Sequence, residues 1–191
     1  METRVAIQTR RSVRSFKKKK PDWRNIIEAI HSAQYAPMAG GNFSLRILII
    51  DDSTKIEKIA DFSEQKFIEE AKYLAIFISD PKVTKIPYGE RGETYLKQQA
   101  GAAMQNFNLH LTDIGLSTCW IGHFNEEEIK RLLKIPKEMN IEAIFPIGYP
   151  KENLKIRQKK PPYNYLYFNE WENKRMKNEP DIQGRMTGFK S

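Results

Sequence analysis

Residues 97–124 read KQQAGAAMQNFNLHLTDIGLSTCWIGHF and combine a long uncharged helical pattern with a short β-prone segment. Apolar residues recur in it at spacings of three and four, which places them on one face of a helix. They are Ala100, Ala103, Met104, Phe107, Leu111 and Ile114. Gly115 suits a helix C-cap, and residues 117–121 favour a strand. This stretch therefore predicts the central helix of an α/β layer, followed by a strand whose end opens onto a site.

The other faces of this predicted helix carry uncharged polar side chains, where an ordinary surface helix carries lysine and glutamate. They are Gln98, Gln99, Gln105, Asn106, Asn108 and Thr112. Amides can be buried where hydrogen-bond partners meet them. The small residues 100–103 would also let another backbone, a flat ligand or a symmetry mate approach closely. A plain core helix is the simpler alternative, and this stretch alone favours neither.

Length and composition limit the possible classes of protein. A chain of 191 residues with 40% hydrophobic and 29% charged residues predicts one globular domain, with or without an arm. The single Cys119 and the absence of an apolar N-terminal segment lead us to expect a cytoplasmic protein. No apolar run approaches the ~20 residues that cross a bilayer. His31, His110 and His123 are scattered and predict no metal site.

The net charge of +8 is compatible with binding to nucleic acid, an acidic membrane surface or a phosphorylated ligand. Three of the basic residues, Arg10, Arg11 and Arg14, lie in the motif RRSVRSF. Guanidinium groups bind phosphate oxygens in pairs and Ser12 adds a hydroxyl, so this motif could clamp a phosphate. A solvated basic surface is the alternative interpretation.

Two segments are candidate ligand loops. YAPMAGGN at residues 35–42 contains adjacent glycines, so it either exposes backbone N–H groups to a ligand or forms a simple turn. We expect residues 80–95 to form a long loop, because they hold two prolines and two glycines and show no periodicity. Its candidates for lining a substrate site are Tyr88, Arg91 and Tyr95. An ordinary surface loop is the alternative.

Periodicity and capping signals predict the remaining elements. Helices are expected over 2–8, 21–34, from 53 or 54 onward, 64–72 and 125–133, and strands over 45–50, 73–79 and 141–147. Pro146 indicates that the last strand lies at a sheet edge or carries a bulge. We expect the polar tail beyond Asn173 to be loosely held.

Several motifs together resemble the FMN-dependent nitroreductase family over residues 3–172. They are RRSVRSF, APMAGGN, AGAAMQNFNLHLTDIGLSTCWIG, and FPIGYPKE followed by KIRQKKP. The resemblance implies an α+β fold with a mostly antiparallel central sheet flanked by helices. It implies an FMN-binding domain at residues 1–172, a polar C-terminal tail at residues 173–191, and an intertwined homodimer with FMN at the subunit interface.

The resemblance assigns FMN contacts to the N-terminal motif. Arg10, Arg11 and Ser12 correspond to contacts with the phosphate and ribityl chain. Arg14 corresponds to the cation beside flavin N1 and the C2 carbonyl. Because reduction leaves negative charge at that edge of the ring, a fixed guanidinium there favours the reduced flavin.

A second set of implied contacts comes from the glycine-rich loop. Pro37, Met38 and Ala39 resemble the segment that packs on the flavin ring from the partner subunit, and Asn42 resembles its amide hydrogen-bonding residue. The family commonly continues with Gln-Pro-Trp, whereas this chain has Ser-Leu-Arg at residues 44–46. This departure bears on the substrate class more than on cofactor binding.

The third set lies late in the chain. Ile121, Gly122 and His123 match the segment whose backbone faces flavin N5 and the pyrimidine edge. Arg157 and Lys159 resemble a basic pair that closes on the phosphate. Both basic clusters of the sequence would then bind one anionic partner.

These resemblances predict an enzyme that moves electrons from NADH or NADPH through flavin N5 to a small acceptor, such as a nitroaromatic or a quinone. The cofactor carries the chemistry, so no catalytic side chain is expected, although the Gly122 backbone lies nearby. A flavin-binding sensor or carrier without reductase turnover is the alternative. A nucleic-acid-binding module is a weaker one, because the chain lacks interleaved aromatic and basic residues.

Overall fold

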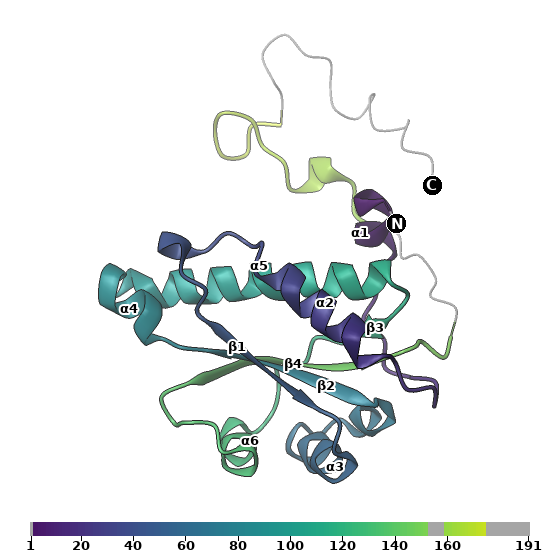
Figure 1. Ribbon diagram of the computed structural model, residues 1–191. Coiled ribbons are helices and arrows are strands. Elements are labelled where there is room, and N and C mark those ends of the chain that lie inside the picture. The colour runs from purple at the N-terminus through teal and green to yellow at the C-terminus, as the bar shows by residue number, and fades with distance from the viewer. Residues whose placement is uncertain (1, 153–158, 175–191) are drawn as a thin grey trace. The chain divides into compact units, whose positions relative to one another are not determined.

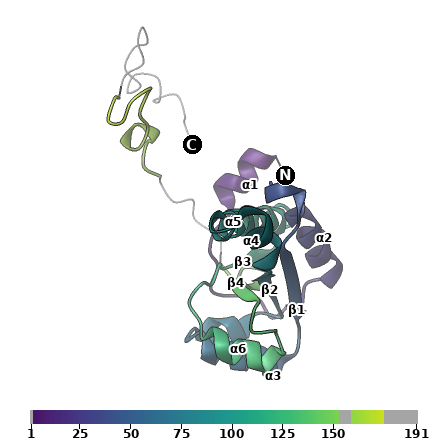
Figure 2. The same ribbon diagram turned by 90° about the vertical axis from the view of Figure 1, so that its left-hand side faces the viewer.

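The computed structural model describes residues 2–152 and 159–174. It divides the chain into two compact units, residues 1–154 and residues 155–191. The first unit holds a four-stranded sheet with α2 and α5 on one face and α3 and α6 on the other (Figures 1 and 2). The division expected after residue 172 stays a prediction.

The helices are α1 (Thr3–Thr9), α2 (Trp23–Ala33), α3 (Ser53–Phe62), α4 (Lys82–Tyr88), α5 (Arg91–Asp113) and α6 (Glu126–Leu133). The 3-10 turns are η1 (Ala39–Gly41), η2 (Lys66–Glu70) and η3 (Pro162–Asn164). The strands are β1 (Leu45–Ile50), β2 (Tyr73–Ser79), β3 (Ser117–Thr118) and β4 (Asn140–Gly148). Within the described residues, no helix has both the length and the apolar character needed to cross a bilayer.

The sheet has the order β1-β2-β4-β3, and every neighbouring pair is antiparallel. This confirms the expected α+β architecture. The edge position expected for β4 is wrong, because β4 lies between β2 and β3. The alternative, a bulge in this strand, is present at Glu142 and not at Pro146, since Phe77 pairs with Ala143 and Ile78 with Ile141. β3 ends at Thr118, which pairs with Ile147, so Pro146 lies just beyond the β3–β4 ladder. The N–H that Pro146 lacks therefore removes no hydrogen bond between these two strands.

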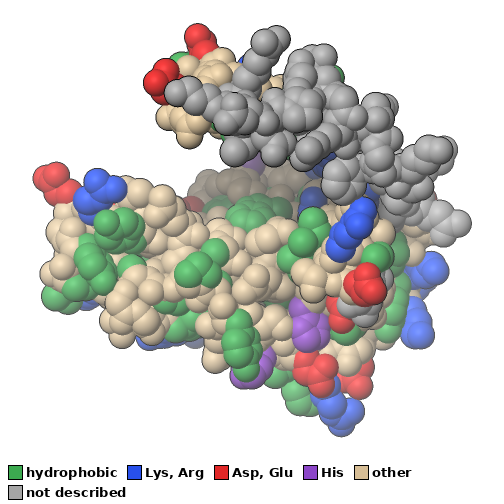
Figure 3. Space-filling view, turned by 90° about the horizontal axis from the view of Figure 1, so that it is seen from above, with side chains coloured by type: hydrophobic (Ala, Val, Ile, Leu, Met, Phe, Trp, Pro, Cys, Tyr) green, Lys and Arg blue, Asp and Glu red, His purple; other side chains and the backbone are tan. Residues whose placement is uncertain are grey.

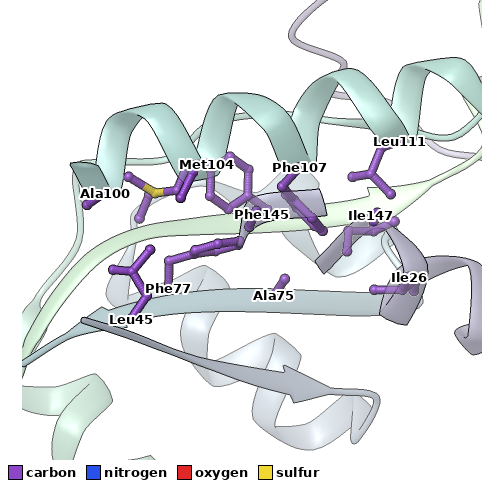
Figure 4. Close-up of a cluster of buried hydrophobic side chains, with 14 of the residues drawn as sticks. Ile26, Leu45, Ala75, Phe77, Ala100, Met104, Phe107, Leu111, Phe145 and Ile147 are labelled. Atoms are coloured by element: carbon purple, nitrogen blue, oxygen red, sulfur yellow. The ribbon is translucent and has the colours of Figure 1, made fainter. Parts of the chain in front are cut away.

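The core between α5 and the sheet is built on three aromatic rings (Figure 4). Phe107 of α5 lies with its ring centroid 5.1 Å from Phe77 of β2 and 5.5 Å from Phe145 of β4. The expected apolar face of the helix is buried from Ala100 to Leu111. Gly115 ends the helix region at φ 77°, which confirms its expected capping role.

Caps set the ends of the helices on the other face. Asp52 accepts hydrogen bonds from the Thr54 and Lys55 N–H groups, so it caps α3 in place of the expected Ser53 or Thr54. Asn125 caps α6 by accepting from the Glu128 N–H at 3.3 Å, which agrees with the expected helix start. The stretch expected to be helical at 64–72 is the short 3-10 turn η2.

The expectation of a long loop over residues 80–95 is wrong, because these residues form α4 and the start of α5. Pro81 caps α4 and Pro87 falls in its last turn, both close to helix ends. Gly89 turns the chain at φ 55°. Gly92 is buried in α5 directly against the backbone of α4. The residues that indicated a loop therefore mark two helix ends, a turn and a close helix contact.

We predict that Gly92→Ala will destabilise the fold at the α4–α5 contact. A Cβ at Gly92 would lie 2.5 Å from the Thr84 carbonyl oxygen and 2.8 Å from the Lys85 Cα, both of which are backbone atoms. Overpacking of this kind costs about 1–3 kcal/mol, measurable by urea unfolding. The exposed Thr94→Ala on the same helix should change stability by less than about 0.5 kcal/mol. Equal stability of the two variants would contradict the close contact.

Candidate functional site

The N-terminal motif extends along the ends of β3 and β4. The Val13 N–H donates to the Thr118 carbonyl at 3.0 Å, and the Lys17 N–H donates to the Tyr149 carbonyl at 2.9 Å. Val13 and Phe16 are buried, whereas Ser12 and Arg14, on either side of Val13, are exposed. The alternation of an extended backbone thus turns the motif's hydroxyl and guanidinium toward solvent.

Glu70, in η2, holds this motif in place. Its carboxylate accepts hydrogen bonds from the Phe16 N–H at 2.9 Å and the Ser15 hydroxyl at 3.2 Å, and Lys151 lies 3.7 Å away. The Phe16 N–H, with a smaller contribution from Lys151, lowers the pKa of Glu70 below its ordinary value. The guanidinium of Arg14 lies 5.9 Å from the ring centroid of Phe67 in the same turn.

The segment after β3 comes to the same place. Ile121 exchanges two backbone hydrogen bonds of 3.0 Å with Ile144 of β4 and is buried. The His123 carbonyl accepts from the Gln65 side chain, next to η2, at 3.4 Å. Gly122 between them is exposed, and a Cβ there would meet no atom within 4 Å.

The surroundings of the Cys119 thiol indicate that the N-terminal motif and the segment after β3 lie close together. Burial raises the pKa of its thiol, while Arg14, Ser12 and Arg10 act in the opposite direction. The backbone contacts agree with this proximity, because Ser12 bridges to Thr118 and the Val13 N–H donates to the Thr118 carbonyl, one residue before Cys119. We call Arg10, Ser12, Arg14, Ile121 and Gly122 the arginine cluster. The Arg11 guanidinium donates at 2.7 Å to the carbonyls of Gln8 and Arg10, within its own segment.

The glycine-rich loop is anchored to α5 by a buried amide. Gln99 accepts from the Ala39 N–H at 2.9 Å and donates to the Ser44 hydroxyl, and both side chains are buried. Ser44, one of the departures from the family pattern, thus has a structural partner inside this chain. Beyond this anchor Gly40 and Gly41 have φ values of 62° and 71°, and Asn42 is exposed.

A pocket of about 480 Å³ opens between this loop and the start of α5. It is lined by Pro37, Met38, Ala39, Tyr88, Tyr95, Gln98 and Gln99. The rings of Tyr88 and Tyr95 meet edge to face at 5.2 Å, and Arg91 lies 5.7 Å from the Tyr95 ring centroid. The structure therefore brings the loop expected to pack on flavin together with Tyr88 and Tyr95 at one site, which we call the loop pocket, whereas Arg91 is not among the lining residues.

The arginine cluster and the loop pocket lie at opposite ends of α5 (Figure 1). Gln99 fastens the loop pocket near the first turns of the helix, whereas the helix ends at Asp113, just before β3. At 1.5 Å per residue, the helix between these two positions is about 20 Å long. A single chain therefore keeps the two predicted halves of a flavin site apart.

The late basic pair is not tested by these contacts. Arg157 lies outside the described residues, and Lys159 is an exposed residue of the second unit. Within that unit the rings of Tyr167 and Trp171 lie 4.7 Å apart, and the Lys174 ammonium lies 3.9 Å from the Tyr167 ring centroid. The aromatic residues there pack on one another and on a lysine.

The sequence profile of the nitroreductase family matches residues 7–149, and the chain belongs to this family. A relative from Archaeoglobus fulgidus, provisionally named NADH dehydrogenase/NAD(P)H nitroreductase, is 26% identical over 76% of this chain and 84% of its own. A nitroreductase family protein from Clostridium novyi NT has a TM-score of 0.74 at 26% identity, covering 91% and 96% of the two chains. The NADPH:FMN oxidoreductase from Vibrio harveyi, solved with NAD+, shares the fold with a TM-score of 0.80 at 19% identity, over 90% and 78%.

Sequence reasoning missed the residues that position the site. Glu70 lies 54 residues from Phe16, and no local pattern connects the two. Gln99 stood out as an uncharged residue on a long helix, but its partners Ala39 and Ser44 lie 60 and 55 residues away. An amide face on an otherwise apolar helix was the one available signal that such partners exist.

We predict that Glu70→Ala will loosen the N-terminal motif without unfolding the protein. Amide hydrogen exchange at Val13, Phe16 and Lys17 should become about three- to tenfold faster near neutral pH. Because the folded pKa of Glu70 is lowered, its stabilisation is present above the unfolded value of about 4.3 and is lost as pH falls through the folded pKa. At acidic pH the exchange rates of the wild-type motif should therefore approach those of the variant.

Glu128→Ala is the matched control, because it removes an exposed carboxylate that pairs with Arg131 on α6. Exchange at the motif should not respond to it. If Glu70→Ala and Glu128→Ala give the same exchange rates at the motif, Glu70 does not hold the motif.

Proposed function

We propose that the protein is an FMN-dependent oxidoreductase that takes electrons from NADH or NADPH and passes them to a small acceptor, such as a nitroaromatic or a quinone. The observation that carries this proposal is the pairing of the motif that holds Arg10, Ser12 and Arg14 with Thr118, at the start of the segment leading to the open backbone at Gly122. Family membership and the Vibrio harveyi relative, whose name includes both NADPH and FMN, support it. The proposal places the enzyme in the cytoplasm, where these donors occur.

The residues of the arginine cluster fit FMN. Two guanidinium groups and a hydroxyl supply the donors that a phosphate and a ribityl chain need. The free space over Gly122 suits the close approach of a flat ring to the backbone. When bound, FMN supplies the two-electron chemistry that the side chains lack. Arg14 would stabilise negative charge at the pyrimidine edge, and the backbone near Gly122 would orient the ring.

We include a homodimer in the proposal. From Gln98 to Thr112, α5 has no Asp, Glu, Lys or Arg, and Gly101 and Ala102 on it are only half buried. Beside it α2 exposes Trp23 and Ile27, and Tyr35, two residues after the end of α2, is exposed as well. On this side of the molecule, hydrophobic and uncharged atoms make up much of the surface, with charged side chains toward its margins (Figure 3). Such a face suits a second copy of the chain, whose loop pocket would complete the arginine cluster.

We predict that the purified protein will carry FMN and that NADH or NADPH will bleach its absorbance under anaerobic conditions. Arg14→Gln should lower the midpoint potential of the bound flavin by about 30 mV, because the reduced form loses a neighbouring positive charge. Arg131→Gln, which removes a 72%-exposed guanidinium from α6, should leave the potential unchanged.

The outcomes of this experiment separate the candidate functions. A yellow protein that no nicotinamide donor bleaches would indicate a flavin-binding protein without reductase turnover. A colourless protein that takes up no added FMN would contradict the proposal altogether.

A further inference from the structure

The loop pocket has two kinds of recognition surface that the proposed function does not use. Tyr88 and Tyr95 line it, and the guanidinium of Arg91, which is not itself a lining residue, lies 5.7 Å from the Tyr95 ring centroid. We propose, building on the proposed function, that the acceptor of this enzyme is an aromatic compound carrying a carboxylate, with Arg91 as the residue that selects for the acid group.

The aromatic part of the ligand is indicated by the shape and lining of the pocket. Two tyrosine rings that meet at 86° give the pocket an aromatic lining, and Pro37 and Met38 add apolar surface to it. The volume of about 480 Å³ lies in the usual range for small-molecule sites. A single substituted ring fits this space, and the amide of Gln98 is available to a polar substituent.

The tyrosines are held in place for this role. Tyr88 ends α4 and its hydroxyl lies against Gly40 of the loop, so close that a Cβ at that glycine would meet the oxygen at 2.9 Å. Tyr95 is half buried on α5, one turn after Arg91. The buried Gly92 lets the backbones of α4 and α5 pack directly against each other. The two tyrosines that line the pocket are therefore held by helix packing.

The acid group is indicated by the state of Arg91. In the described residues, Arg91 forms no salt bridge and its only assigned contact is with the Tyr95 ring. Glu90 and Glu93 are its nearest acidic neighbours in sequence, but residues one and two positions apart on a helix do not face each other. The guanidinium stacked near an aromatic wall is thus available to a carboxylate on a ring held by that wall.

We would test this with para-nitrobenzoate and para-nitrobenzamide, which differ in charge but hardly in shape. Calorimetry on the purified full-length protein measures binding, and anaerobic reoxidation of the reduced protein measures turnover. We expect the wild type to bind the acid about tenfold more tightly than the amide. Arg91→Gln should abolish this preference by weakening the acid alone, and Arg91→Lys should retain part of it.

Arg131→Gln removes the same charge from α6, on the opposite face of the sheet, and should keep the full preference. If Arg91→Gln keeps the preference, or if the wild type shows none, the inference is wrong. If the phosphate of NADPH is the true partner of Arg91, the variant will instead lose affinity for NADPH relative to NADH and treat the two nitro compounds as the wild type does.

The binding measurement also separates this inference from the proposed function. Arg91-dependent binding of the acid by a protein without flavin would contradict the proposed function and support the ligand class. Turnover of both nitro compounds with equal kcat/KM, insensitive to Arg91, would support the proposed function and overturn the inference.

Discussion

The packing of α5 along the sheet is the constraint on which the rest of the structure depends. Phe107 meets Phe77 and Phe145 at the centre of this contact, and each buried aromatic ring contributes about 2–3 kcal/mol to the stability of the fold. A helix held rigidly at its middle fixes what lies at its two ends. The loop pocket is attached at the first turns, and the chain that leads to the arginine cluster leaves from the last.

Two sets of polar contacts, one made by the buried Gln99 and one by the exposed Glu70, then turn this scaffold into two defined surfaces. Gln99 ties Ala39 and Ser44 to the start of α5, and Glu70 ties the N-terminal motif to η2. The cost of such contacts is asymmetric: leaving one buried donor without its partner costs about 1–3 kcal/mol, more than an average hydrogen bond contributes. These residues therefore determine where the predicted ligand groups lie.

The part of this architecture that follows a local pattern could be predicted from the sequence. The helical period of α5, the cap at Gly115 and the apolar strand β2 each depend on residues a few positions apart. The helix α4 was missed because Pro87 and Gly92 usually indicate loops, and here they serve a helix end and a helix contact. The role of Glu70 could not be predicted, because its partners become neighbours only in the folded chain. The arginine motif was recognised from its residue types, but its proximity to Cys119 required the fold.

The central claim is that one flavin site needs the arginine cluster of one subunit and the loop pocket of another. Two variants, Arg14→Glu and Pro37→Glu, should each lose FMN, because each damages one half of every site. Mixed by refolding together, they should regain about a quarter of the wild-type flavin, since half of the dimers would be mixed and each would hold one intact site. Flavin that stays absent from the mixture would show that both halves must come from the same chain, and would contradict the claim.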